Sequence, residues 1–568
     1  MTDAPLFSII TPVYNPPLDV LTDTIESVLD QEYDGWELIL VDDCSPDPGV
    51  RELLRAYAAK DPRIRVIERE TNGHIVAASN DAVAAARGTF LAMLDHDDLL
   101  TPTALARNAE RIADHDDVDY LYSDEDKIDD EGTFYDTFLK PTWSPERLRG
   151  QMYTSHLSVA RTALVREVGG FREGYDGSQD HDLILRVTER ARRVVHIPEI
   201  LYHWRIIPGS AAESADAKPY AWVAGKQAVQ DHLDRLGLAA TAGFGEHPGL
   251  YTLHRDLDPD LTVSLVIPTI GKSGMIWGAE RVFVLEAVRT VMEKTRHPSF
   301  EIVVVYDPPT PESVLRDLRE VAGDRLRLVK FTEPFNYSRK MNLGVLAATG
   351  QRLVFLNDDV SVRSDRWLED LVGPLDEPDV GMTGAKLYFS NTTIQHAGHS
   401  YNVGQYLHPF IGEPGASAGR FGALKINREA SGVTAACSAM RRETFFEVGG
   451  FAESLPLNFN DVDLCYKTRS LGYRIVWVAT AELFHFESRT RERVVEAWEK
   501  AAAVARWGNP SHDPYLPASR PVPITGVATG KVGRSGVDAR VGVRVAGAER
   551  GPRLTGRQAG RKPAKRRA

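Results

Sequence analysis

Short apolar runs alternate with longer segments of helical composition in the first 100 residues. Four runs have the length and composition of buried strands, at residues 7–15, 36–43, 64–69 and 89–98. The segments 50–59 and 74–87 predict helices, and Gly88 is expected to end the second of them. Strands that alternate with helices are typical of a mainly parallel sheet covered on both faces, so the predicted fold class is α/β.

The same order of runs returns after residue 260, at 264–271, 301–307, 326–331 and 351–360. Spacing also repeats: Asn80, Gly88 and Asp95 are separated by 8 and 7 residues, and Asn342, Gly350 and Asn357 by the same intervals. These matches indicate a tandem duplication of one α/β domain of about 250 residues, which is a normal domain size.

A third correspondence follows a VGGF tetrapeptide in each half. Asp180 matches Asp461, and Asp182 matches Asp463. His203 and His485 come 23 and 24 residues after the first acid of each pair. The domains are therefore predicted at 1–240 and 261–512, with a Gly- and Pro-containing linker at 241–260 and a tail at 513–568.

Cysteine content and the distribution of apolar residues indicate the cellular compartment that the protein is expected to occupy. The three cysteines, Cys44, Cys437 and Cys465, form no disulfide framework, and no run of about 18 apolar residues predicts a membrane-spanning helix. The N-terminus lacks the pattern of a signal peptide, so a cytoplasmic protein is expected.

Charge is unevenly spread along the chain. Residues 519–568 hold 13 Lys and Arg against two acids, a net of +11, so the other 518 residues carry −24. The basic tail predicts disorder and a peripheral contact with the anionic inner face of the membrane, although a solvated tail without a partner fits equally well. The acidic body argues against nucleic acid as a partner.

Acidic residues crowd the end of the strand predicted at 89–98. Asp95, Asp97 and Asp98 repel one another and need a counter-charge, and Mg²⁺ or Mn²⁺ suits oxygen ligands. The alternative is a solvated turn that begins a helix near Thr101–Pro102. Recurrence of the cluster as Asn357, Asp358 and Asp359, after identical spacing, favours a metal site.

Two further pairs carry candidate chemistry. His203 and His485 recur in place, which favours metal ligands over surface or core histidines. Asp180 and Asp461 stand where helices are expected to begin, so each is a candidate general base or a helix N-cap. His396 and His399 have a spacing compatible with metal binding, but we expect them to line a substrate cleft.

Together, in order and twice, these motifs resemble family 2 glycosyltransferases of the GT-A fold. The motifs of the first half are TPVYN (11–15), VDDCS (41–45), NGH…N (72–80), LDHDD (94–98), GSQDHDL (177–183) and YHWR (202–205). Those of the second are IPT (267–269), FNYSRKMNLG (335–344), LNDDV (356–360), FNDVDL (459–464) and LFHFE (483–487). The second half resembles bacterial enzymes of O-antigen, rhamnan and galactan assembly.

The resemblance implies transfer of a sugar, with inversion, from a nucleotide-diphosphate donor to an acceptor hydroxyl. It implies UDP- or dTDP-sugar donors, a glycan or lipid-linked acceptor, and Mn²⁺ or Mg²⁺ as the cofactor. The implied bases are Asp180 and Asp461, and the implied metal ligands are Asp95, Asp97, His203, Asp359 and His485. Residues implied to contact the nucleotide-sugar are Thr11, Pro12, Tyr14, Asp42, Asn80, Asp95, Pro268, Asp307, Asn342 and Asp358.

The second half departs from the family pattern at YDPPT (306–310) and at Asn357, and both changes lower local negative charge. Two active domains are the favoured interpretation, and one domain degenerate and kept for acceptor binding is the alternative. A non-catalytic carbohydrate-binding protein is a further alternative. The two candidate bases argue against it, because binding alone needs no base. The chain also lacks the glycine-rich loops expected of a nucleotidyltransferase or a dehydrogenase, which argues against both of these enzyme classes.

Overall fold

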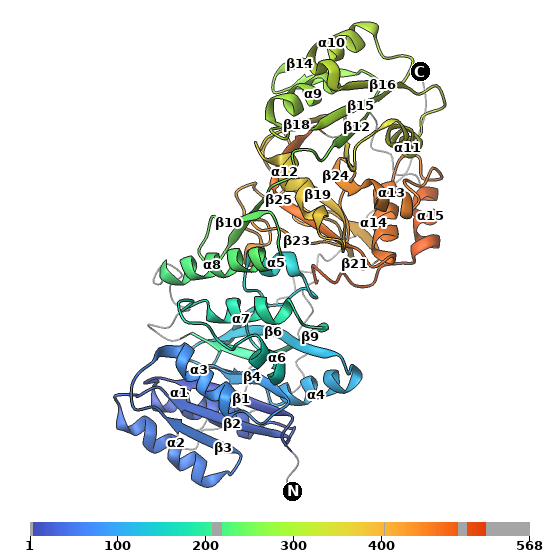
Figure 1. Cartoon of the computed structure of the whole chain (residues 1–568). Coiled ribbons are helices and arrows are strands. Elements are labelled where there is room, and N and C mark those ends of the chain that lie inside the picture. Colours follow the sequence, from blue (N-terminus) through green and yellow to red (C-terminus); the bar gives the residue numbers. More distant parts are fainter. Residues whose placement is uncertain (1–3, 207–218, 403, 487–496, 518–568) are drawn as a thin grey trace, which may run out of the picture. The chain divides into compact units, whose positions relative to one another are not determined.

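The computed structural model describes residues 4–206, 219–402, 404–486 and 497–517. It contains two large mixed sheets, mostly parallel and flanked by helices (Figure 1). This arrangement confirms the predicted α/β fold class. The domain boundaries given above stay a prediction.

The first large sheet lies within residues 7–205. Its strands are β1 (Phe7–Val13), β2 (Trp36–Asp42), β3 (Ile64–Glu68), β4 (Phe90–Met93), β5 (Leu99–Leu100), β6 (Val118–Ile128), β7 (Phe134–Phe138), β8 (Ser158–Arg161) and β9 (Arg193–Arg205). The helices of this half are α1 (Leu18–Leu29), α2 (Pro48–Lys60), α3 (His74–Ala85), α4 (Ala104–Asp114), α5 (Pro145–Gly150), α6 (Thr162–Glu167), α7 (Gln179–Thr188) and α8 (Pro219–Arg235). A hairpin of β10 (Ala240–Phe244) and β11 (Tyr251–Arg255) follows.

Strand order explains where a ligand would bind. The order is β3-β2-β1-β4-β8-β6-β9-β5, with β7 paired to β6, and β1 to β4 are mutually parallel. The chain moves from β1 outward to β2 and β3, and then returns to the other side of β1 as β4. In open α/β sheets ligands bind beyond the carboxyl ends of the strands at such a reversal, here between β1 and β4.

The second large sheet lies within residues 263–485. Its strands are β12 (Val263–Thr269), β15 (Phe300–Tyr306), β16 (Leu326–Lys330), β17 (Arg352–Leu356), β18 (Val360–Val362), β19 (Val380–Tyr388), β20 (Ile394–His396), β23 (Arg428–Glu429), β24 (Cys437–Arg441) and β25 (Arg474–His485). Two small hairpins accompany it, β13 (Ser273–Ile276) with β14 (Ala279–Val282) and β21 (Ser400–Asn402) with β22 (Gln405–Leu407). The helices of this half are α9 (Phe283–Lys294), α10 (Glu312–Ala322), α11 (Tyr337–Ala347), α12 (Trp367–Val372), α13 (Arg442–Glu447), α14 (Asn460–Ser470) and α15 (Ala497–Trp507), with 3₁₀ turns η2 (Gly323–Arg325), η3 (Gly373–Asp376) and η4 (Arg420–Gly422).

The topology of the first sheet is repeated in the second. The order is β16-β15-β12-β17-β24-β19-β25-β18, with β20 on β19. Each strand takes the place of its counterpart, so β12 and β17 correspond to β1 and β4. The reversal of strand order therefore recurs between β12 and β17, which predicts a second ligand site there.

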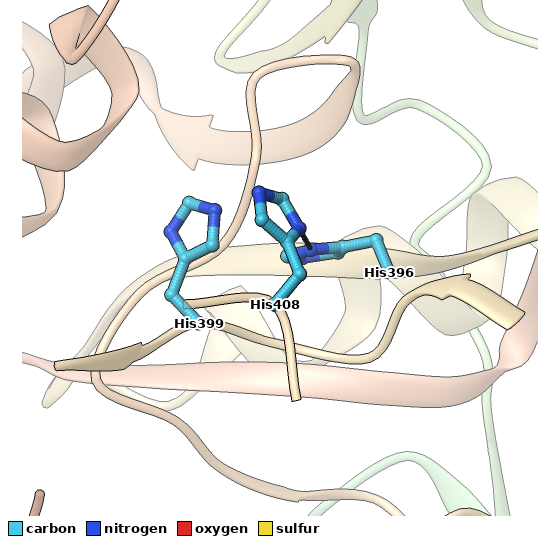
Figure 2. Close-up of side chains that lie close together, drawn as sticks. All are labelled: His396, His399 and His408. Atoms are coloured by element: carbon cyan, nitrogen blue, oxygen red, sulfur yellow. Dashed lines mark hydrogen bonds between the residues drawn. The ribbon is translucent and has the colours of Figure 1, made fainter. Parts of the chain in front are cut away.

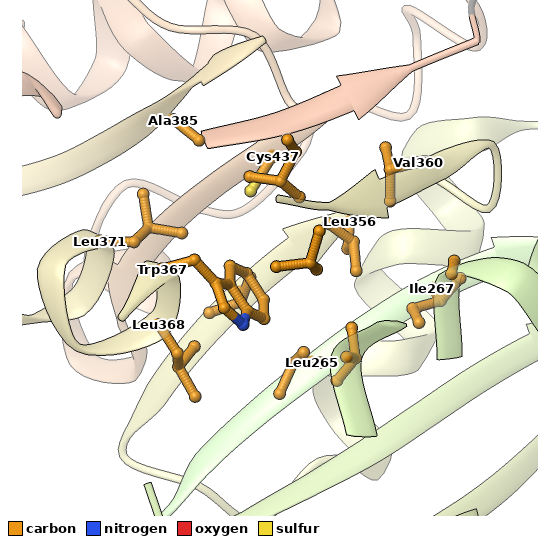
Figure 3. Packing of buried hydrophobic residues seen from close by; sticks show 14 of the residues in the cluster. Leu265, Ile267, Leu356, Val360, Trp367, Leu368, Leu371, Ala385 and Cys437 are labelled. Carbon is orange, nitrogen blue, oxygen red and sulfur yellow. The ribbon is translucent and has the colours of Figure 1, made fainter. Parts of the chain in front are cut away.

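Both faces of each sheet are buried by helices. In the second half, α9, α10 and α12 cover one face and α11, α13 and α14 the other. Figure 3 shows the packing on the first of these faces, where Trp367 of α12 lies among Leu265, Leu356 and Cys437 from three strands. Its indole nitrogen donates to Thr295 Oγ1 at 3.1 Å, so the polar edge of this buried ring is satisfied.

Gly88 has a different role from the predicted helix stop. Helix α3 ends at Ala85, and Ala86 is already extended. A Cβ at Gly88 would lie 2.5 Å from the Ser8 backbone nitrogen, and one at Gly350 would lie 2.6 Å from the Thr262 carbonyl oxygen. Glycine recurs at this position because the chain passes very close to the first strand of each sheet.

The predicted disordered tail needs a later start than residue 513. Asp513 is buried, and its Oδ2 accepts a hydrogen bond from the Tyr401 backbone nitrogen at 2.7 Å. The folded chain therefore includes residues 513–517. The remainder of the tail, 518–568, with the basic residues on which the membrane prediction rests, lies outside the described residues. Among the helices of the described ranges, none has the length and apolar character needed to cross a bilayer.

Candidate active sites

The acidic turn of the second half stands at the reversal of strand order. Sequence predicted one strand over 351–360, but β17 ends at Leu356 and β18 begins at Val360. Residues 357–359 form the turn between them, at the carboxyl end of β17. Thr269, the last residue of β12, donates from Oγ1 to Asp358 Oδ2 at 2.6 Å, so the ends of the two strands are joined.

Asp359 and His485 are brought together as the sequence predicted. His485 pairs with Val360 in the β18–β25 ladder, and its Nε2 lies 3.1 Å from Asp359 Oδ1. The Nδ1–H of His485 donates to Gln395 Oε1 at 2.8 Å, which leaves Nε2 to accept from Asn357 Nδ2 at 3.2 Å. A carboxylate beside an imidazole whose orientation is fixed by a second partner is a donor set that suits a divalent cation.

The charge balance of this turn differs from that of a simple acidic cluster. Burial, with the neighbouring Asp359, raises the pKa of Asp358 to about 7, against the opposing bond from Thr269. Lys340 of α11 donates to Asp307 Oδ2 at 2.9 Å and to the Thr269 carbonyl oxygen at 3.0 Å. The site therefore holds one buried ammonium, whose pKa burial lowers, close to its carboxylates.

The sequence pattern gave Lys340 no predicted role, although the residue lies within the motif FNYSRKMNLG (335–344). It stands two residues before Asn342, and the corresponding residue before Asn80 is Ala78. Comparison of the two halves reveals the residues that both halves share. A residue that is present in only one half therefore cannot be recognised from the repeat.

The two candidate bases occupy equivalent positions on two helices. Asp180 is the second residue of α7 and Asp461 the second residue of α14, while the N-cap residues are Ser178 and Phe459. The N-cap alternative is therefore wrong for both. In the second half, Asp461 Oδ1 accepts a hydrogen bond from the Val462 nitrogen at 2.8 Å. In the first half, burial raises the pKa of Asp180.

One cavity joins the predicted groups of the second half. It has a volume of about 460 Å³, and its lining includes Asp358, Asp359, His485 and Asp461. Pro268 and Asp358, which were predicted to contact the nucleotide-sugar, line the same cavity. The predicted metal ligands and the predicted base thus face a common space.

The acidic cluster of the first half has a different arrangement. Ligand atoms of Asp95, Asp98 and His156 lie within 4.8 Å of one another. His203, predicted to share a cation with Asp97, has its Nδ1 hydrogen-bonded to Asp126, so its role as a metal ligand stays a prediction. Burial raises the pKa of Asp97, and Asp98 accepts from Tyr202 Oη at 2.6 Å.

His156 was missed because its segment, just before β8, carries no recognisable motif. Its Nε2 lies 3.9 Å from Asp95 Oδ2, and its Nδ1 lies 3.4 Å from Glu125 Oε2. Burial alone would lower its pKa, but the bond to and charge of Glu125 raise it to about 9. The register of β8 and β24 places Ala436 at the matching position of the second half.

Several residues predicted to touch the nucleotide are held by the protein itself. Asp42 is buried and accepts from Arg51 Nε at 2.7 Å. Asn80 is hydrogen-bonded through both side-chain atoms to the backbone of Phe171, and Asn342 to that of Phe451. Thr11 is buried and Tyr14 is half exposed, and the carbonyl of Pro12 contacts His96 Nδ1 at 3.1 Å. Their role in donor binding stays a prediction.

Comparison with known proteins identifies the class that this fold and these sites define. The model of the family described as glycosyl transferase family 2 matches residues 8–167 and again 264–449. The chain therefore belongs to glycosyl transferase family 2, with a match in each half.

Relatives match along most of the chain. An uncharacterized protein, y4gI of Sinorhizobium fredii, is 41% identical over 540 residues, which cover 92% of this chain and 58% of that protein. The O-antigen biosynthesis protein RfbC of Myxococcus xanthus is 35% identical over 517 residues, which cover 90% of this chain and 40% of that protein. The chain thus spans about half the length of these two relatives.

Among solved structures, Staphylococcus aureus TarS in complex with UDP-GlcNAc is 21% identical, with a TM-score of 0.32 over 40% of this chain and 72% of that chain. A mannosyltransferase of Pyrobaculum calidifontis in complex with GDP-Man and Mn²⁺ is 17% identical, with a TM-score of 0.31 over 41% of this chain and 65% of that chain.

Proposed function

We propose that the protein is an inverting glycosyltransferase of cell-surface polysaccharide assembly, with one active site in each half. The observation that carries the proposal is the cavity lined by Asp359, His485 and Asp461. Its strongest support among relatives is the similarity to RfbC, whose name places that protein in O-antigen biosynthesis. The donors would be UDP- or dTDP-sugars, and the acceptor a glycan or lipid-linked glycan.

In this proposal each side chain of the second cavity has one task. Asp461 takes the proton of the acceptor hydroxyl as the new glycosidic bond forms at the anomeric carbon. The leaving group is a nucleoside diphosphate, whose charge Lys340 partly balances from its place beside Asp307. One in-line displacement inverts the anomeric centre, so no covalent nucleophile is needed.

Asp359 and His485 would hold the divalent cation, Mn²⁺ or Mg²⁺. Their oxygen and imidazole donors fit such an ion, which, when bound, stabilises the negative charge of the departing diphosphate. In the first half Asp95 and Asp97 would do the same with His203, and Asp180 would act as the base. The pKa of Asp180 is raised by burial, which makes its carboxylate a stronger base.

A nucleotide-sugar panel in the presence of Mn²⁺ tests this proposal. Asp97→Ala and Asp359→Ala should each abolish transfer of one sugar class and leave the other intact. The matched controls are Asp117→Ala and Asp365→Ala, which remove exposed carboxylates that pair with arginine or lysine in the same two halves. If Asp359→Ala leaves every activity at the wild-type level, the second active site is wrong.

A monofunctional transferase is the second candidate. The halves differ at the sites themselves, where Lys340 replaces Ala78 and His156 replaces Ala436. If only one half transfers sugar, the other would bind the acceptor. In that case one of the two aspartate variants would lose all transfer, and the other would raise KM for the acceptor without loss of any sugar class.

A further inference from the structure

Three histidines of the second half lie together beside the proposed base. His396 ends β20, His399 precedes β21, and His408 follows β22, and Figure 2 shows their imidazole rings gathered in one place. The ring centroids are 5.0 Å apart for His396 and His399, 5.1 Å for His396 and His408, and 4.7 Å for His399 and His408. One ring nitrogen from each residue lies within 4.8 Å of those of the other two.

The local chain explains why these rings meet. Gly398, with φ of +81°, reverses the chain between His396 and His399 in a conformation that L-residues with side chains rarely adopt. The β21–β22 hairpin then returns His408 toward His396, whose Nδ1 lies 3.0 Å from Nδ1 of His408. A turn and a hairpin, and not sequence adjacency, assemble the cluster.

The cluster belongs to a segment that distinguishes the two halves. Forty residues (397–436) separate β20 from β24, whereas 19 residues (139–157) separate the equivalent strands β7 and β8. His399 and His408 lie within this longer connection. The cluster is therefore an addition to the second half and not part of the duplicated site.

Burial and second partners prepare the imidazoles to act as ligands. His396 and His399 are buried, and burial disfavours the charged form of an imidazole. Buried histidines are thereby kept in the neutral form that metals require. His399 Nδ1 lies 3.2 Å from Tyr401 Oη, a contact that orients the ring and leaves Nε2 as its ligand atom.

We propose that His396, His399 and His408 bind one zinc ion whose remaining coordination position faces the cavity that Asp461 lines. Three imidazoles with one open position form a common donor set for Zn²⁺, whereas Mn²⁺ and Mg²⁺ prefer oxygen ligands. This site is separate from the Asp359–His485 pair. The open position would take an oxygen of the acceptor sugar next to the base.

One contact must change when the ion binds. Thr434 donates its backbone N–H to His396 Nε2 at 3.2 Å, so the Nδ1 proton of His396 points to His408. A zinc ion bound at Nδ1 requires that proton to move to Nε2. A small turn of the His396 ring then breaks the weak contact with Thr434, and the imidazole stays neutral throughout.

Metal titration of the full chain, purified without a polyhistidine tag and treated with a chelator, tests the site. We expect one Zn²⁺ per chain to bind in excess Mg²⁺, and Co²⁺ to give the visible absorption of a low-symmetry nitrogen site. His408→Ala changes an exposed residue and should preserve folding. It should weaken Zn²⁺ binding at least about 100-fold, because even outer-shell partners of a zinc ligand are worth 10–100-fold.

Two controls separate this site from the other proposals. His512→Ala removes another exposed histidine and should leave Zn²⁺ affinity unchanged. Asp359→Ala should leave it unchanged as well, whether or not the second half transfers sugar, because the measurement is binding and not activity. Equal Zn²⁺ affinity for the wild type and His408→Ala, or no zinc-specific binding by the wild type, would overturn the proposal.

Discussion

At the scale of single residues, two neighbouring aspartates show how burial and pairing give similar side chains different roles. Asp180 and Asp182 are two residues apart on α7, yet Asp182 is fully buried and paired with Arg172 and Arg186. Its carboxylate is thus committed to structure, while Asp180 bonds only the adjacent His181 nitrogen among the contacts of the described chain. The sequence pattern selects both acids, but only burial and pairing distinguish the candidate base from the structural acid.

His181 gives a residue-scale prediction for the pH dependence of stability. Burial lowers its pKa from 6.5 to about 4, although its Nε2–H donates to the Leu148 carbonyl oxygen at 2.7 Å. Below pH 6.5 the unfolded chain therefore binds a proton that the folded chain does not. The free energy of unfolding of the first half should fall by roughly 3 kcal/mol as pH drops from 6.5 to 4.

Denaturant unfolding at a series of pH values measures this slope. His181→Gln should be less stable at neutral pH, because it disturbs the bond to Leu148, but its stability should change less with pH over the same window. His115→Gln, which alters an exposed histidine of the same half, should keep the wild-type slope. Parallel slopes for His181→Gln and the wild type would contradict the assignment.

At the scale of elements, a side-chain clamp repeats between a helix and a glycine-rich turn. Asn342 of α11 donates to the Phe451 carbonyl oxygen at 3.0 Å and accepts from the Phe451 nitrogen at 3.0 Å, and Asn80 of α3 makes the same pair of bonds at 2.9 Å with Phe171. These contacts join the helix to the turn that precedes the base-bearing helix. The clamp explains the repeated asparagine in structural terms.

Asn342→Ala tests whether this residue is structural or contacts the nucleotide. Both backbone groups of Phe451 would lose their partner, so the second half should be destabilised by about 1–3 kcal/mol. KM for the donor should change little in protein that remains folded. Asn391→Ala, at an exposed turn, is the control with a smaller expected effect. A raised donor KM with unchanged unfolding would instead support the predicted nucleotide contact.

The order of strands and helices was predictable because each half alternates short apolar runs with amphipathic segments. The breaks between strands at residues 94–98 and 357–359 were not predictable, because acidic residues at the end of an apolar run look like part of the strand. Two of the three residues of the histidine cluster, His396 and His399, could be recognised from their spacing in the sequence. His408 joins it through a hairpin whose return path depends on tertiary packing, which no local pattern encodes.

At the scale of the whole chain, duplication preserved topology more strictly than chemistry. The two large sheets have the same strand order, and the proposed bases, Asp180 and Asp461, stand at the same helical position. The acidic turns differ: His156 adjoins Asp95 in one half, and Lys340 and the histidine cluster adjoin the other. Identical scaffolds with different site residues are what two transfer steps with different donors or acceptors would require.

This reasoning predicts the behaviour of mixed variants. If the proposed roles hold, Asp180→Asn and Asp461→Asn should each slow one transfer step by about 100-fold to 10,000-fold, since each removes a proposed general base. Neither variant alone should then make a product that contains both sugars. A mixture of the two should make it, because the product released by one protein is the acceptor for the other, and the rate should rise with the concentration of both.

The double variant Asp180→Asn/Asp461→Asn is the matched control, and it should make no product under any condition. Mass spectrometry of the released glycans measures each sugar separately. If Asp461→Asn alone still adds both sugars, the second half contributes no base and the chain is monofunctional. If the mixture fails although each variant performs its own step, the intermediate must pass between the halves of one chain without release, and the two sites work as a single processive unit.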